Sequence, residues 1–325
     1  MFLLLAGCAA TGPATVGPDL EPIVVGAELL PVPPRPDPTP PPPAPPREAP
    51  RADIALVVDP GAAAHADVAD AIEAALPARR YRITRFTTAG QELEALRTRR
   101  VTVVAVGPEA VIAARAALPD KPLVFCQVPA YTAALRPGTP TWGVETLPPL
   151  SLQLKSWQSL DPSLRTIALI VGASGAALAE QARHAATELA ADLLVEKSGS
   201  DRETLYIFRR IAPTVDGLWL LPDNDALSPQ VLLEMLTLSS TRGIGVLTFN
   251  EALLTRGALL TATAVPSDVA ETVARIVERV VAGRTADLPA MTPLRAAELA
   301  VNVDVAAALG LPPVTVPRWV ARDPD

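Results

Sequence analysis

Short apolar runs alternate with helix-length segments along most of the chain, from residue 52 onward. The runs at 53–58, 101–106 and 166–171 consist mostly of Val, Ile, Leu and Ala, and each is followed by apolar residues at helical spacing. Parallel strands have this composition because helices cover both faces of their sheet. The alternation therefore predicts an α/β fold built from βαβ units.

The alternation falls into two series, which are separated by a stretch rich in Pro and Gly at 136–143. The first series has predicted strands at 53–58, 81–86, 101–106 and 123–127, and predicted helices at 64–76, 91–99 and 109–118. The second has predicted strands at 166–171, 193–196, 217–221 and 245–249, and predicted helices at 150–160, 176–191, 202–211 and 229–240. A strand at 259–264, a helix around 269–280 and a strand at 299–303 follow. Two such series predict two Rossmann-like lobes with parallel sheets around a central cleft, where ligands of open α/β sheets bind.

The first eight residues form a short apolar run that ends in Leu5-Ala6-Gly7-Cys8 and matches the bacterial lipobox. The motif predicts a lipoprotein signal at 1–8 and lipidation of Cys8, whose acyl chains would each add about 0.8 kcal/mol of membrane affinity per buried CH₂. No Lys or Arg precedes the run, and it is short for a complete signal, so we expect the true start codon upstream. The alternative is a chance Cys after a few leucines.

Residues 9–51 form a predicted linker. Fifteen of the 36 prolines fall between Pro13 and Pro50. Proline locks φ and cannot donate a hydrogen bond, so we expect extended polyproline II rather than packed structure. At about 3.1 Å per residue the linker would reach roughly 100 Å, enough to act as a spacer from a membrane. A ligand for a proline-binding partner is the alternative.

Charge and composition exclude several classes of function. The net charge of −7, without a cluster of Lys and Arg, argues against nucleic-acid binding. Two His and two Cys cannot build a three-His zinc site or a framework of several disulfides. We expect no metal and no cofactor.

The order of motifs in the second half of the chain resembles a known family. Strand 218–221 leads into Pro222-Asp223-Asn224, the strand at 245–249 leads into Asn250-Glu251, and Arg256-Gly257 follows. Together with 106–110, 121–125, 280–283 and 301–311, this order is similar to the tryptophan/tyrosine-type substrate-binding proteins of ABC transporters (the ABC_sub_bind group). The resemblance covers roughly residues 52–317 and is diffuse, because order and spacing carry it rather than one sharp motif.

The resemblance implies the type I periplasmic-binding-protein fold, in which the chain crosses three times between two lobes that close on a small ligand. It implies a first lobe at 52–145 and 256–287, a second at 146–255 and 288–317, and a tail at 318–325. It also implies that Asp223 and Asn224 belong to the pocket, where a carboxylate can receive an ammonium and an amide can donate and accept. The alternative is that both residues form an Asx turn and a helix cap.

Further candidate ligand-binding residues lie at or just after the ends of predicted strands, on the edge that faces the cleft. They are Asp59, Gly107, Glu109, Gln127, Ser174, Asn250 and Glu251. Gly107 begins a strand-to-helix turn, where backbone N–H groups can hold a carboxylate. Pro108 lacks an N–H and Glu109 adds negative charge, however, so this turn departs from the usual carboxylate cradle. The acidic rim favours a cationic or polyhydroxylated ligand.

We predict that the protein is not an enzyme. The segment 172–176 imitates a nucleophile elbow around Ser174, but its glycine is displaced, and His184 lies about 15 Å along the same helix. Cys126 ends a predicted strand and is expected to be a small buried residue. His65, near the start of a helix, is either a ligand contact or solvated.

These features predict a lipid-anchored, extracytoplasmic solute-binding protein of the bacterial cell envelope. Its partners would be an amino-acid-like or cationic small molecule and an ABC permease, with the membrane contacted only through the lipid. The alternative is a ligand-sensing or structural envelope lipoprotein that docks a protein partner without a permease.

Overall fold

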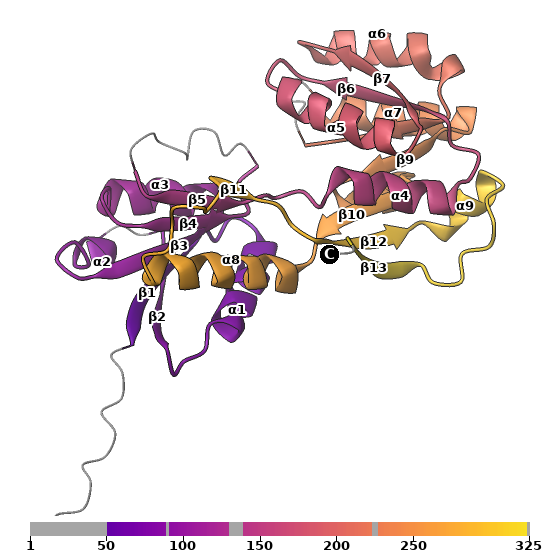
Figure 1. Ribbon diagram of the computed structural model, residues 1–325. Coiled ribbons are helices and arrows are strands. Elements are labelled where there is room, and N and C mark those ends of the chain that lie inside the picture. Colours follow the sequence, from indigo (N-terminus) through magenta and orange to yellow (C-terminus); the bar gives the residue numbers. More distant parts are fainter. Residues whose placement is uncertain (1–50, 89–90, 130–138, 223–226, 324–325) are drawn as a thin grey trace, which may run out of the picture. The chain divides into compact units, whose positions relative to one another are not determined.

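The chain is built around two β-sheets, each with helices on both faces (Figure 1). The computed structural model describes residues 51–88, 91–129, 139–222 and 227–323. Elements β1 to β13 belong to one compact unit. The predicted α/β class with two largely parallel sheets is confirmed.

The first sheet has six strands in the order β11-β5-β4-β3-β1-β2, and all neighbours are parallel. Its strands are β1 (Ala52–Val58), β2 (Tyr81–Thr87), β3 (Val101–Val106), β4 (Leu123–Cys126), β5 (Thr141–Val144) and β11 (Met291–Thr292). All residues of β3 and β4 are buried, as expected for central strands covered on both faces.

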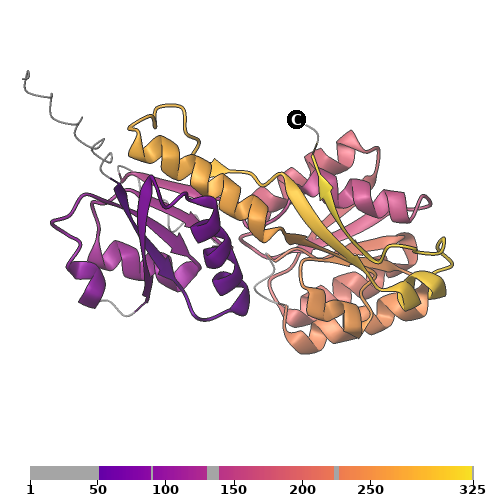
Figure 2. The same cartoon turned by 90° about the horizontal axis from the view of Figure 1, so that it is seen from below.

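Four helices cover the first sheet. They are α1 (Ala63–Ala75), α2 (Gln91–Glu94), α3 (Pro108–Ala117) and α8 (Pro266–Val281). Helices α1 and α8 pack side by side and share one buried cluster with β1, β3 and β4 (Figures 1 and 2). Helices α2 and α3 cover the opposite face. The predicted helix at 91–99 is helical only over its first four residues.

The second sheet has seven strands in the order β13-β12-β10-β9-β8-β6-β7. They are β6 (Thr166–Val171), β7 (Asp192–Lys197), β8 (Gly217–Trp219), β9 (Gly245–Thr248), β10 (Leu260–Ala264), β12 (Ala296–Val301) and β13 (Arg318–Arg322). The strands from β6 to β10 are parallel, whereas β12 runs antiparallel to both β10 and β13.

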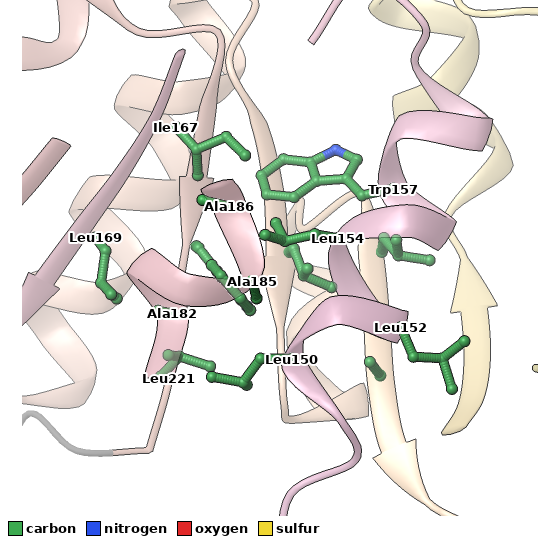
Figure 3. Close-up of a cluster of buried hydrophobic side chains, with 14 of the residues drawn as sticks. Leu150, Leu152, Leu154, Trp157, Ile167, Leu169, Ala182, Ala185, Ala186 and Leu221 are labelled. Carbon is green, nitrogen blue, oxygen red and sulfur yellow. The ribbon is translucent and has the colours of Figure 1, made fainter. Parts of the chain in front are cut away.

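Helices α4 (Leu150–Leu160) and α5 (Ala176–Glu188) cover one face of the second sheet, and α6 (Asp201–Ile211) and α7 (Pro229–Arg242) cover the other. The short α9 (Val303–Ala308) joins the α4 side. Trp157 on α4 lies in the cluster with Leu154 and Ile167 (Figure 3) and is fully buried. A Cβ at Gly217 would lie 2.6 Å from the Trp157 ring, so glycine at the start of β8 makes room for the indole.

The chain passes from one sheet to the other three times. The passages are 145–149 between β5 and α4, residue 265 between β10 and α8, and 293–295 between β11 and β12. Asp268 on α8 fixes the third passage, because its buried carboxylate accepts the backbone N–H groups of Arg295 (2.8 Å) and Ala296 (3.0 Å).

Three segments pair differently from the expected lobes. Strand β10 was expected in the first lobe with 256–287, but it pairs with β9 and β12 in the second sheet. Strand β11 was expected in the second lobe with 288–317, but it pairs with β5 in the first. The expected tail at 318–325 contains β13, which pairs with β12 and places Arg318 beside Glu251 and Glu298. The apolar residues of a strand do not indicate which strand it will pair with. That pairing is decided by the packing of the whole fold.

Candidate functional site

A cavity of about 300 Å³ lies where strands of both sheets end. Its lining residues are Ala64, Asp67, Val68, Gln127, Pro129, Thr146, Leu147, Pro148, Pro222, Phe249, Ala262, Thr263, Ala264 and Pro266. Gln127 directly follows β4, Phe249 directly follows β9, and Thr263 lies near the end of β10. This is the position at which open α/β sheets bind ligands.

The first passage between the sheets forms one wall of the cavity through Thr146, Leu147 and Pro148. The fully buried Gln153 on α4 fixes this wall: its amide nitrogen donates to the Pro148 carbonyl (2.9 Å), and its amide oxygen accepts from the Trp219 indole (3.3 Å). The Thr146 hydroxyl oxygen is buried without a hydrogen-bond partner among the described residues.

Gln127 is the predicted site residue that lines this cavity. Its backbone has φ = +58°, a left-handed conformation that costs a non-glycine residue of order 1 kcal/mol. No described residue is hydrogen-bonded to its side-chain amide, a group that can both donate and accept. Strain of this kind persists where the surrounding structure imposes it and is concentrated at functional sites.

Asp223 and Asn224 lie outside the described residues, so their assignment to the pocket stays a prediction. Pro222, directly before them, does line the cavity.

Asp59 and Gly107 lie together at the ends of β1 and β3, outside the cavity lining. The buried Asp59 carboxylate accepts the Gly61 N–H (2.8 Å), and its other oxygen lies 3.8 Å from the His65 ring. His65 Nδ1 is also 3.0 Å from the Asp59 carbonyl oxygen. The side chain of His65 is thus mostly buried and held by Asp59, rather than solvated.

The remaining predicted residues are also absent from the lining of this cavity. Asn250 caps the 3₁₀ helix Glu251–Arg256, since its side chain accepts the Ala252 N–H (3.0 Å). Glu251 forms an ion pair with Arg318 on β13. Glu109 and Ser174 are exposed at the start of α3 and before α5. Ligand contacts by these residues stay predictions.

The residues considered for catalysis lie in unfavourable surroundings. Cys126 is completely buried in the first sheet, and desolvation raises its pKa to about 12, so the thiol stays protonated at neutral pH. His184 lies on the exposed face of α5, where it is 3.4 Å from Glu188. Among the described residues, no group of three His, Cys, Asp or Glu side chains could hold a metal.

A smaller cavity, of about 170 Å³, lies between the first passage and α5. Glu145 lines it, and burial raises the pKa of this carboxyl above its usual value. Among the described residues, a single strand end contributes to this cavity, that of β5 through Glu145. Strands of both sheets end at the cavity of about 300 Å³, so we assign the binding site there.

Asp67, Thr146, Phe249 and Thr263 line the cavity but were not among the residues predicted from the sequence. Phe249 ends a predicted strand and could have been found by the rule that identified Gln127. Asp67 lies within a helix, and the direction in which its side chain points depends on how α1 packs on the sheet. Helical spacing alone does not determine that packing.

The fold is similar to that of several solved binding proteins. CD0873 from Clostridium difficile, a substrate-binding protein with adhesive properties in its ligand-free, open structure, aligns with a TM-score of 0.61 and 14% identity, over 81% of this chain and 96% of that chain. The ABC domain from Streptococcus pneumonia in complex with L-Trp aligns with a TM-score of 0.54 and 15% identity, over 82% and 96%. The periplasmic ribose ABC transporter from Conexibacter woesei aligns with a TM-score of 0.51 and 14% identity, over 81% and 96%.

No protein-family model matches the sequence, and no curated protein matches it. At such low identities the structural likenesses show the fold alone, which is that of the type I periplasmic-binding proteins. In the described ranges, no helix is long and apolar enough to span a membrane.

Proposed function

We propose that the protein is an extracytoplasmic solute-binding protein that captures a small molecule in the cavity at the strand ends and delivers it to an ABC transporter. The observation that carries this proposal is the cavity itself, which is lined together by residues at strand ends of both sheets and by the first passage between them. When the two sheets close on a ligand in such a site, residues from both sides contact it. Closure also excludes water, which strengthens the polar contacts to the ligand. The ABC domain in complex with L-Trp and the periplasmic ribose ABC transporter share the fold.

Ligand capture predicts a thermal shift. At a hundredfold excess over Kd, a ligand stabilises the fold by about 2.7 kcal/mol, which raises Tm by several degrees in a chain of this size. Amines, amino acids, nucleosides, polyamines and sugars would be screened by differential scanning fluorimetry. Ala64→Trp should fill the cavity from its exposed rim on α1 and abolish the shift of any hit.

Ala66→Trp is the matched control, because Ala66 is exposed on the same helix and lies outside the lining. Both variants should melt within a few degrees of the wild-type protein without ligand. A hit that Ala64→Trp retains at full strength binds elsewhere, and a broad screen without any hit would refute solute capture.

Lipid anchoring at Cys8 is the second part of the proposal. It rests on the lipobox-like residues Leu5 to Cys8. We expect Cys8→Ser to move the protein from the detergent phase into the aqueous phase on Triton X-114 partitioning of expressing cells. Cys126→Ser, which leaves the lipobox intact, should remain in the detergent phase. Equal partitioning of the Cys8→Ser variant and the wild-type protein would contradict the anchor.

The long proline-rich segment at 9–51 favours a second candidate, an envelope lipoprotein that senses a ligand or docks a protein partner without a permease. Chromosomal neighbours distinguish the two candidates. Adjacent permease and ATPase genes support transport, whereas their absence together with a failed ligand screen supports docking.

A further inference from the structure

The charge of the cavity at the strand ends restricts the ligand that it can hold. Of its fourteen described lining residues, Asp67 alone is acidic, and none is Lys, Arg or His. An ion that leaves water for a partly desolvated site binds well only where an opposite charge or several hydrogen bonds receive it. The described part of the lining therefore provides a partner for a cation and no basic side chain for a carboxylate.

The Asp67 carboxylate is available for such a cation. It is exposed on α1 and forms no ion pair or hydrogen bond with another described residue. The next acidic residues of the same helix are engaged instead, because Asp70 and Glu73 lie 2.5 Å and 4.0 Å from Arg85 on β2. Helix α1 thus directs two carboxylates to its neighbouring strand and one to the cavity.

The N-terminus of α1, which also borders the cavity at Ala64, carries partial positive charge that would favour an anion. This end already has a carboxylate of its own. Asp59 is buried just before the helix, where it accepts the Gly61 N–H and lies beside His65 in the first turn. The positive end of α1 is therefore compensated within the fold.

Neutral polar groups can complete the coordination of an ammonium. The Gln127 amide oxygen has no hydrogen-bond donor among the described residues, and the left-handed backbone of Gln127 fixes this residue at the cavity. The Thr146 hydroxyl oxygen is likewise without a partner among the described residues. Both oxygens can accept from an N–H.

The rest of the lining is apolar. Phe249 lines the cavity and is 37% exposed. The other apolar lining residues are Ala64, Val68, Pro129, Leu147, Pro148, Pro222, Ala262, Ala264 and Pro266. Such a surface favours a hydrocarbon or aromatic body, and the Phe249 ring can also interact with a cation.

We propose that this cavity binds a primary amine that has an apolar body and no carboxylate. Asp67 receives the ammonium, the Gln127 amide oxygen accepts one of its N–H groups, and Phe249 packs against the body. The inference rests on the proposed function, because it assigns a ligand class to the same cavity.

The test compares amines with their parent amino acids by isothermal titration calorimetry on the full chain. The pairs are 2-phenylethylamine with L-phenylalanine, tyramine with L-tyrosine and isobutylamine with L-valine. We expect the amine of at least one pair to bind ten times more tightly than its amino acid, and putrescine, which lacks an apolar body, to bind more weakly than that amine. Asp67→Asn should weaken amine binding at least tenfold, whereas Asp70→Asn, the matched control on α1, should leave it unchanged.

The inference is wrong if in every pair the amino acid binds as tightly as the amine, if no amine binds, or if Asp67→Asn binds the amine as the wild-type protein does. If amines fail while a sugar, nucleoside or amino acid binds and loses affinity in Ala64→Trp, only the ligand class is refuted and solute capture stands. If no compound binds, both fail.

Discussion

Replacement of Trp157 by alanine is expected to lower the free energy of unfolding by about 4 kcal/mol, which corresponds to a fall in Tm of roughly 10 °C. The indole is completely buried in the cluster that joins α4 to the second sheet (Figure 3), and β8 begins with a glycine that leaves room for it. Removal of so large a side chain leaves a cavity that the rigid strands around it cannot fill. Urea denaturation would measure the loss.

Two further variants make this prediction specific. Trp157→Phe should cost less than half as much, because it keeps most of the ring and removes an indole N–H that has no acceptor among the described residues. Trp319→Ala on the edge strand β13 should cost only about 1 kcal/mol, since Trp319 is half-buried. If Trp157→Ala and Trp319→Ala lowered the free energy of unfolding by similar amounts, α4 would not be central to the core of the second sheet.

Replacement of Gly107 by alanine is expected to destabilise the protein by about 3 kcal/mol, because backbone strain and overpacking act together. Gly107 has φ = +93° and ψ = 160°, a region that only glycine adopts readily. An added Cβ would lie 2.7 Å from Asp59 Cβ and 2.7 Å from His65 Cε1. Thermal unfolding without ligand measures the effect.

Gly283→Ala is the control for strain alone. Gly283 has φ = +70° and no atom within 4 Å of an added Cβ, so its replacement should cost only about 1 kcal/mol. Combining Gly107→Ala with His65→Ala removes one of the clashing groups and should recover part of the loss. If Gly107→Ala instead melts like the wild-type protein and only loses ligand binding, Gly107 acts on the ligand directly, as the strand-end rule predicted.

From the sequence, residues of the binding site could be predicted only at positions that directly follow a strand. Gln127 could be identified because it directly follows β4, and the carboxyl ends of parallel strands meet at one edge. Asn250 and Glu251 satisfy the same rule, yet they are bound to Ala252 and Arg318 within the fold. A position after a strand therefore does not distinguish a residue that lines a cavity from one that caps a helix or forms an ion pair.

The sequence by itself determined the alternation of strands and helices in this protein. The predicted bounds of β3, β6 and α4 agree with the structure, because a strand buried on both faces must be continuously apolar and a helix that covers it must repeat its apolar residues about every 3.6 positions. These constraints act locally, so they are visible in the chain.

Only the tertiary structure decided which strands pair and which polar residues share a cavity. The chain enters the first sheet again after β10, returns after the two-residue β11, and adds β13 at the edge. Each choice depends on contacts between segments far apart in sequence, which apolar periodicity does not record. Asp67 reaches the cavity for the same reason: the packing of α1 on the first sheet and against α8 decides which of its acidic residues faces the strand ends.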